Sequence, residues 1–125
     1  LFAELLSEEF TVQAVCLFVF IGHCFPIWLK FKGGKGVATY IGIVTSINFF
    51  FGLVTCVIWL LSAAMLRISS FSALLSTISG PFIVFFLLDS SFLGMSAMLS
   101  CLIFWTHRAN IRRILNGTES NINVN

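Results

Sequence analysis

The sequence predicts an all-α membrane protein, a polytopic transmembrane helical bundle, from its composition and from the lengths of its apolar runs. Of its 125 residues, 58% are hydrophobic and only 10% are charged, and the mean hydropathy is +1.03. A soluble domain carries about 25% charged residues. So much apolar surface on so small a chain requires lipid as the surrounding solvent, because water could not cover it.

About five apolar segments follow one another, and we expect them to form helices of one transmembrane domain over residues 1–125. The first, 10–29, contains no Lys, Arg, Asp or Glu and is long enough to cross a hydrocarbon core of about 30 Å. Pro26 lies near its end, where a proline should stop or kink the helix. A basic, glycine-rich loop follows at 30–36.

The uncharged stretch 37–66 is either one very long helix or two helices with a turn near 46–48. Two crossings place all seven Lys and Arg residues on one side of the membrane, whereas a single crossing scatters them over both. Acidic residues then fall on the opposite side, namely Glu4, Glu8, Glu9 and Asp89. The positive-inside rule therefore favours the hairpin and makes the basic side cytoplasmic. The first arm, about 37–47, is short for a full span, so we expect it to pack within protein.

Two further apolar segments, 68–88 and 92–106, precede a polar tail. The cysteines lie singly inside apolar runs, at Cys16, Cys24, Cys56 and Cys101. That placement favours small buried apolar side chains over disulfides or metal ligands. The net charge of +2 is too small to indicate nucleic-acid binding.

The loop between the first two segments has the composition of a phosphate site. It contains Lys32, Gly33, Gly34, Lys35 and Gly36, directly before a helix that opens at Val37. Glycines let backbone N–H groups approach an anion, and a helix N-terminus adds partial positive charge to that of the lysines. It is not a Walker A loop, because a glycine follows Lys35. A flexible basic turn that obeys the positive-inside rule is the alternative.

A second polar cluster begins where the last apolar segment ends. If the tail is helical, His107 and Asn110 share a face. With an ordinary pKa of about 6.5, His107 could serve as a general base or as a phosphate ligand. The alternative is a basic amphipathic tail, with Arg108 among its cations, that lies on anionic lipid. His23, just before Pro26, could face a polar site or cap a carbonyl that the proline frees.

Both clusters resemble signature motifs of one family. GHCFPIWLKFKGGKGVAT at 22–39 and HRANIRRILNGTE at 107–119 look like the second and third motifs of the bacterial acyl-phosphate:glycerol-3-phosphate acyltransferases, the PlsY family. The resemblance implies a multi-pass enzyme of the bacterial inner membrane with its active site open to the cytoplasm. Such an enzyme moves a fatty acyl group from acyl phosphate to the 1-hydroxyl of glycerol 3-phosphate, for phospholipid synthesis, without acyl-CoA, metal or nucleotide.

The resemblance also implies site residues. The glycine loop with Lys35 would hold phosphate, and His107, Asn110 and Glu119 would belong to the active site. We expect Lys32, His23 and Arg108 to help bind phosphate or substrate. The family's first motif, a Ser and Arg followed by a Gly-Ser-Gly-Asn stretch, has no match in this sequence. We therefore expect a domain truncated at its N-terminus, lacking roughly the first third of the enzyme and inactive alone.

Acyl phosphate is already an activated donor, so no nucleophilic side chain is needed. The sequence shows no convincing Ser–His pair and no acidic partner near either histidine. We expect direct attack by the glycerol hydroxyl, with the protein positioning the substrates and stabilising phosphate charge. Three other interpretations remain: a small anion transporter subunit, a membrane protein without chemistry, and an inactive remnant of the enzyme.

Overall fold

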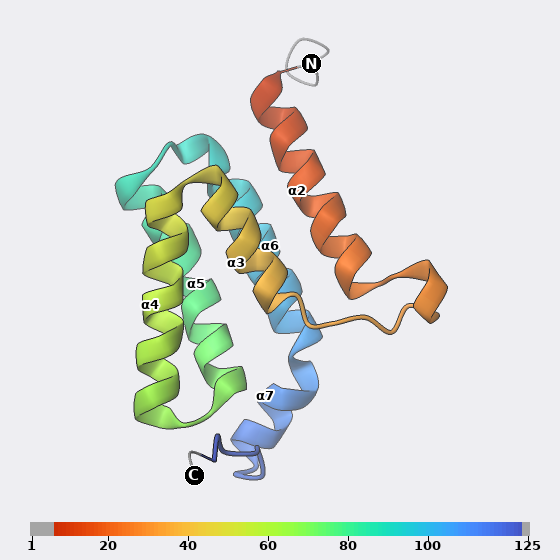
Figure 1. The fold of residues 1–125 in the computed structure, drawn as a ribbon, viewed down its shortest axis with the longest axis vertical. Coiled ribbons are helices and arrows are strands. Elements are labelled where there is room, and N and C mark those ends of the chain that lie inside the picture. The colour runs from red at the N-terminus through yellow and green to blue at the C-terminus, as the bar shows by residue number, and fades with distance from the viewer. Residues whose placement is uncertain (1–6, 124–125) are drawn as a thin grey trace.

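The structure, a computed structural model, describes residues 7–123 and shows an all-helical bundle (Figure 1). Its α-helices are α2 (Glu8–Cys24), α3 (Val37–Ile47), α4 (Phe49–Leu66), α5 (Ser69–Leu87), α6 (Leu93–Thr106) and α7 (Arg108–Leu115). Two short 3₁₀ helices, η1 (Ile27–Leu29) and η2 (Ser90–Phe92), interrupt the connections. The long helices α2 to α6 lie side by side, and α7 lies at one end of the bundle (Figure 1).

Local sequence explains where these helices begin and end. The Ser7 hydroxyl caps α2 by accepting from the Phe10 N–H at 3.2 Å. Pro26, in an extended conformation, follows the end of that helix, as predicted. Asn48 separates α3 from α4, and its side chain accepts from the Phe51 N–H at 3.0 Å. The predicted hairpin within 37–66 is therefore confirmed.

Within residues 7–123, three helical stretches are long and apolar enough to cross a membrane: Glu8–Leu29, Phe49–Leu66 and Ser69–Leu87. The two other apolar helices, Val37–Ile47 and Ser90–Thr106, are shorter. With eleven residues, α3 is roughly 16 Å long, about half of a hydrocarbon core. It packs against α2, α4 and α5, as a short arm in a membrane must.

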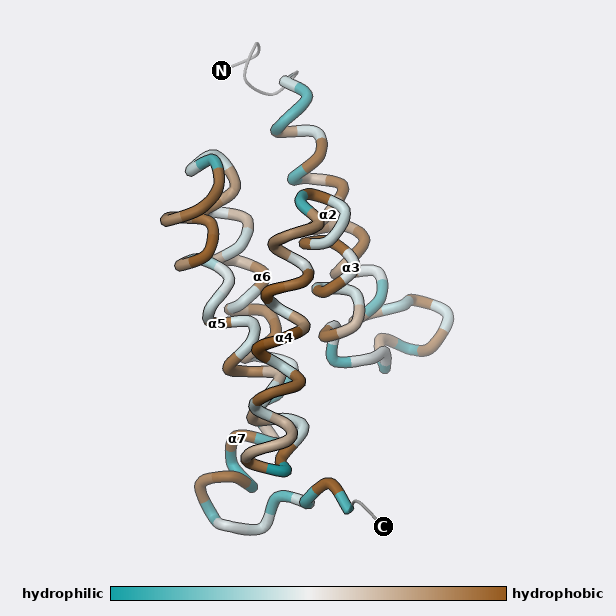
Figure 2. The backbone as a smooth tube through the Cα atoms, turned by 60° about the vertical axis from the view of Figure 1, so that its left-hand side comes forward, coloured by the Kyte–Doolittle hydropathy of each residue, from teal (hydrophilic) through white to brown (hydrophobic). Residues whose placement is uncertain are grey.

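Charge gathers at the two ends of the bundle. The α2–α3 loop, the α4–α5 turn and α7 lie at one end and carry all seven Lys and Arg residues. Glu8, Glu9 and Asp89 lie at the other end, while Glu4 falls outside the described residues. In Figure 2, hydrophilic residues (teal) lie mainly at the ends of the helices and in the connections between them, and hydrophobic residues (brown) dominate along the helices. Of the described acidic residues, Glu119 alone lies at the basic end, where it lines a cavity.

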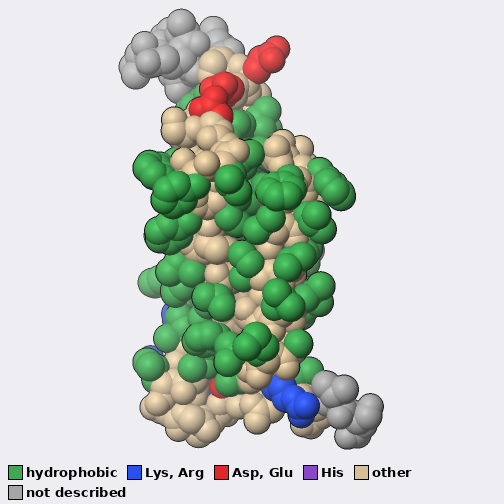
Figure 3. Space-filling view, turned by 90° about the vertical axis from the view of Figure 1, so that its left-hand side faces the viewer, with side chains coloured by type: hydrophobic (Ala, Val, Ile, Leu, Met, Phe, Trp, Pro, Cys, Tyr) green, Lys and Arg blue, Asp and Glu red, His purple; other side chains and the backbone are tan. Residues whose placement is uncertain are grey.

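Lipid-facing and inward-facing side chains differ in kind. Large apolar residues are exposed along the outside of the helices, and they cover the face seen in Figure 3. Small polar residues are buried between helices instead: Thr55, Ser62, Ser70, Ser72, Ser76, Thr77, Ser96 and Ser100. One of them, Ser100, donates across the α5–α6 interface to the Thr77 carbonyl at 2.7 Å. Small and polar residues at helix interfaces are typical of membrane bundles, so this is a membrane protein.

The four cysteines are all free, but only Cys24 is buried. Cys16 and Cys56 are half-buried, and Cys101 is exposed. The prediction of buried cysteines is therefore wrong for Cys101. The physical reason is that a thiol side chain loses nothing by facing lipid, so its burial in protein is not required.

Candidate active site

A cavity of about 640 Å³ opens at the basic end of the bundle, where the α2–α3 loop and the C-terminal tail meet helices α2, α3, α4, α5 and α7. Its polar lining residues are His23, Lys35, Ser69, Ser70, His107, Asn110, Glu119 and Ser120. Gly36 and the apolar residues Val37, Ala38, Ile41, Trp59 and Ala73, from α3, α4 and α5, complete the wall. The cavity therefore joins cationic and hydrogen-bonding groups to an apolar wall between helices.

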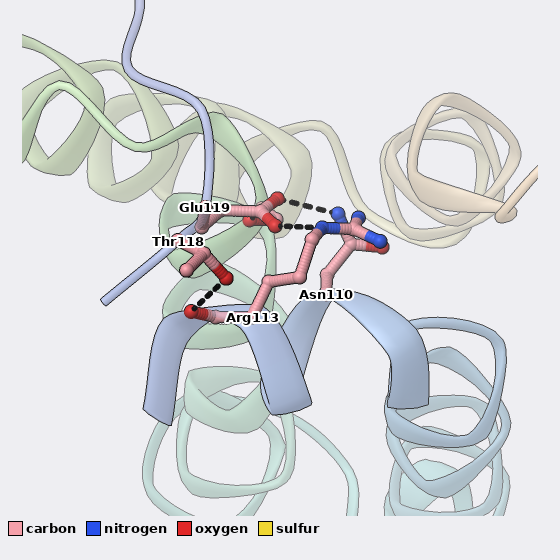
Figure 4. Close-up of polar contacts among 5 residues, drawn as sticks. Asn110, Arg113, Thr118 and Glu119 are labelled. Atoms are coloured by element: carbon pink, nitrogen blue, oxygen red, sulfur yellow. Dashed lines mark hydrogen bonds and ion pairs between the residues drawn. The ribbon is translucent and has the colours of Figure 1, made fainter. Parts of the chain in front are cut away.

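Glu119 holds the C-terminal tail against this cavity. Its Oε1 accepts from the Ser70 hydroxyl at 2.7 Å and from Nδ2 of Asn110 at 2.6 Å. Its Oε2 accepts from Nε of Arg113 at 2.6 Å (Figure 4). The hydrogen bonds from Ser70 and Asn110, and then the bond and charge of Arg113, lower the pKa of Glu119 to about 2. The carboxylate is therefore ionised, and it links α5, α7 and the tail.

This arrangement fixes the orientation of the Asn110 side chain. An ionised carboxylate only accepts hydrogen bonds, so the nitrogen of the Asn110 amide must face Glu119. The amide oxygen then faces away from it. Asn110 is 5% exposed, and Oδ1 has no hydrogen-bond partner within residues 7–123. An unsatisfied buried acceptor costs about 1–3 kcal/mol, so this oxygen is available to a hydrogen-bond donor that enters the cavity.

His107 presents a second free acceptor. Its Nδ1 lies 2.8 Å from the Ile103 carbonyl oxygen, which can only accept. Nδ1 therefore carries the proton, and Nε2 keeps its lone pair in the neutral ring. Burial lowers the pKa of His107, and the positive charge of Lys35 lowers it further, against opposing effects of the Ile103 bond and Glu119. The ring is neutral at pH 7, with a basic nitrogen available.

The loop that carries Lys35 packs tightly on the end of α2. A Cβ on Gly33 would overlap the His23 carbonyl oxygen, and one on Gly34 would lie 2.6 Å from Nε2 of His23. Gly36 has a φ of 85°, which favours glycine, and a Cβ there would overlap the Phe20 ring. The glycines thus serve close packing. The Gly33 N–H donates to the Cys24 carbonyl at 3.2 Å and is not free for phosphate.

The fold brings together six of the predicted site residues: His23, Lys35, Gly36, His107, Asn110 and Glu119. It places Lys32, Gly33 and Gly34 in a second cavity, of about 250 Å³, and His23 borders both cavities. Arg108 lies outside them, with its guanidinium carbon 5.1 Å from the Trp105 ring centroid and a 2.9 Å hydrogen bond to the Trp105 carbonyl.

Sequence reasoning missed several residues of the site. Ser70 and Arg113 contact Glu119, and Trp59 lines the cavity. Two adjacent serines, Ser69 and Ser70, follow Arg67 at the start of an apolar segment, and this pattern could have indicated Ser70. Nothing in the sequence indicated Trp59. Folding brings Glu119 into the cavity that His107 lines, although no hydrogen bond joins the two side chains.

Comparison with known proteins identifies the family of this chain. A family model described as "Glycerol-3-phosphate acyltransferase" matches residues 1–117. The chain belongs to the glycerol-3-phosphate acyltransferase family. A glycerol-3-phosphate acyltransferase of Rhodopseudomonas palustris (strain BisB5) is 47% identical over 103 residues, which cover 82% of this chain and 53% of the relative. One from Ruegeria sp. (strain TM1040) is 42% identical over 122 residues, 98% of this chain and 60% of the relative.

Two solved structures share the fold. The crystal structure of PlsY (YgiH), an integral membrane glycerol 3-phosphate acyltransferase, in its glycerol 3-phosphate form matches with a TM-score of 0.83 at 29% identity, over 95% of this chain and 62% of that chain. The lysophosphatidic acid form matches with a TM-score of 0.83 at 30% identity, over 94% and 63%. The chain thus spans between about half and two thirds of the length of these relatives.

Proposed function

We propose that this chain contributes to a glycerol-3-phosphate acyltransferase that transfers a fatty acyl group from acyl phosphate to the 1-hydroxyl of glycerol 3-phosphate. The products are lysophosphatidic acid and phosphate. Family membership and the relatives' names support the reaction class. The observation that carries the proposal is the cavity, in which a lysine, the unpaired Oδ1 of Asn110 and the lone pair on Nε2 of His107 lie beside an apolar wall. That combination matches two phosphate-bearing substrates, one of which has an acyl chain.

Phosphate charge is assigned to the loop side of the cavity. Lys35 supplies a full positive charge, and Val37 and Ala38, in the first turn of α3, line the same space. The N–H groups of a first helical turn have no partners within the helix and favour an anion. No side chain caps this helix, since Gly36 occupies the cap position. The anion of a substrate would take the place of that cap.

The acyl acceptor is assigned to the opposite wall. Oδ1 of Asn110 and Nε2 of His107 only accept, so they suit a hydroxyl donor better than phosphate oxygens. They orient the glycerol hydroxyl, whose oxygen attacks the acyl carbonyl as its O–H bond breaks. The carbon–oxygen bond to phosphate then breaks, and phosphate leaves. The departing phosphate and Nε2 are the bases at the site, and positioning provides much of the rate enhancement.

No acyl-enzyme is needed in this scheme. The Ser70 hydroxyl already donates to Glu119, so it is not paired with a histidine as an activated nucleophile would be. The apolar wall from Ile41, Trp59 and Ala73 would receive the acyl chain, with membrane lipids as neighbours. We assign the basic mouth of the cavity to the cytoplasmic face of the bacterial inner membrane, and the positive-inside rule supports that orientation.

The decisive experiment measures inorganic phosphate released from acyl phosphate by the purified full-length protein that contains this sequence, in lipid vesicles, with and without glycerol 3-phosphate. We expect release to depend on glycerol 3-phosphate and Lys35→Ala to abolish it. Lys32→Ala is the matched control, because Lys32 lines the other cavity, and it should retain most of the rate. Normal release by Lys35→Ala, or a trapped covalent acyl-enzyme, would refute the mechanism. Anion flux across the vesicles without turnover would favour a transporter instead.

A further inference from the structure

Thr106 connects the glycine-rich loop to the histidine side of the cavity. Its hydroxyl lies 2.9 Å from the Lys35 carbonyl oxygen, across 71 residues of sequence. Thr106 is the last residue of α6 and directly precedes His107. Among residues 7–123, this is the one hydrogen bond that joins the loop at 30–36 to α6. It therefore spans the two walls to which we assigned phosphate and hydroxyl.

Competition for acceptors decides where the hydroxyl proton goes. Thr106 Oγ1 is also 2.9 Å from the Ile103 carbonyl oxygen, within its own helix. That oxygen already receives the His107 backbone N–H at 3.0 Å and the His107 ring Nδ1–H at 2.8 Å. A carbonyl oxygen has two lone pairs, and these two donors fill them. The Thr106 hydroxyl therefore donates its single proton to the Lys35 carbonyl oxygen.

The two ends of this bond differ in how firmly they are held. Ile103 is fully buried, and His107 is 2% exposed, so the end of α6 is fixed by packing. Lys35 is exposed, and its loop is otherwise held on one side only, by the close packing of its glycines on α2 and by the bond from Gly33 to Cys24. Loss of the Thr106 bond would free the loop on its α6 side. The separation between the ammonium of Lys35 and the acceptors on His107 and Asn110 would then no longer be fixed.

We infer that Thr106 is a positioning residue, whose hydroxyl holds the backbone of Lys35 at the distance from His107 that the substrates require. This inference rests on the proposed function for its kinetic consequence. Thr106 touches no substrate in this scheme and acts only through the loop. A threonine hydroxyl can be removed almost isosterically, by valine, and restored by serine, which makes the role testable.

The experiment compares wild type, Thr106→Val and Thr106→Ser in lipid vesicles by steady-state kinetics and by amide hydrogen exchange. For Thr106→Val we expect the KM for at least one phosphate substrate to rise about tenfold, as loss of one hydrogen bond of about 1.4 kcal/mol predicts, while kcat changes less than twofold. The loop amide of Gly33, whose N–H is bonded to the Cys24 carbonyl, should exchange faster, with the amides of α4 unchanged. Thr106→Ser should restore both readouts. Thr11→Val, which loses a hydroxyl bonded only within α2, is the control and should match wild type.

Unchanged KM values and unchanged loop exchange in Thr106→Val would overturn the inference, as would failure of Thr106→Ser to restore them. A variant that exchanges faster throughout the bundle would show a general packing defect and would also overturn it. If wild type shows no turnover that depends on glycerol 3-phosphate, the proposed function fails. The exchange of the loop amides still decides in that case whether Thr106 tethers the loop.

Discussion

Gly80 lies in α5 at the point where Tyr40 of α3 and Ser96 of α6 come closest to it. Tyr40 and Ser96 are both fully buried. A Cβ on Gly80 would overlap Oη of Tyr40 and lie 3.0 Å from Oγ of Ser96 and 3.4 Å from Cζ of Tyr40. Neither side chain faces open space, so Gly80→Ala must displace α3 or α6.

The size of this effect follows from two opposing contributions. Alanine favours a helix over glycine by about 1 kcal/mol. Overpacking of a buried site costs about 1–3 kcal/mol. We therefore expect Gly80→Ala to destabilise the fold by up to about 2 kcal/mol. Tyr40→Phe removes Oη and keeps the ring, so the same alanine should be neutral or stabilising in that background. The two substitutions should couple by about 1–3 kcal/mol.

Reversible unfolding of the purified protein in mixed dodecyl maltoside and SDS micelles, followed by far-UV circular dichroism, measures the four free energies of the cycle. Gly42→Ala in α3 is the control, because a Cβ there meets nothing within 4 Å. It should be neutral or stabilise by up to about 1 kcal/mol. Equal destabilisation by Gly80→Ala with Tyr40 and with Phe at position 40 would show that Oη does not set the contact, and would refute the reasoning.

Four further predictions concern the cavity. Glu119→Gln should weaken the hydrogen bonds to Ser70, Asn110 and Arg113. Proteolysis of the tail after α7 should therefore become faster, and phosphate release should fall at least tenfold. Unchanged proteolysis would contradict the role of Glu119 in holding the tail against the cavity. The folded-state pKa of Glu119 is about 2, below its ordinary value of 4.5, so the carboxylate stabilises the fold fully above pH 4.5. That contribution to the free energy of unfolding is lost as the pH falls toward 2. Glu119→Gln should not show this dependence on pH. Burial lowers the pKa of His107, so the unfolded chain binds a proton at a higher pH than the folded protein does. The free energy of unfolding should therefore also fall as the pH drops below 6.5. Unfolding measurements across this pH range should show that His107→Gln removes the dependence. Trp59→Ala should enlarge the space beside the apolar wall and raise kcat/KM for longer acyl phosphates relative to shorter ones. The same chain-length preference in wild type and variant would rule out this role for Trp59.

The helical plan was accessible from the sequence because local features determine it. Runs of apolar residues set the spans, Pro26 ended one helix, and Asn48 supplied a cap between two others. Charge placement selected the hairpin over a single long helix. The cavity was only partly accessible. Motif spacing indicated Lys35, His107 and Asn110, whereas the separation of Lys32 from Lys35 into different cavities depends on how the loop packs against α2.

The sequence by itself determined that this is a helical membrane protein with its cations at one end and with two polar motifs there. These properties depend on composition and on order along the chain, which need no knowledge of contacts. Only the tertiary structure decided which side chains face lipid and which face protein, because the chain is apolar nearly everywhere. It also decided that Glu119 orients the Asn110 amide and that Thr106 reaches Lys35. Such contacts between distant residues depend on the angles and distances between packed helices, and no local pattern in the chain contains them.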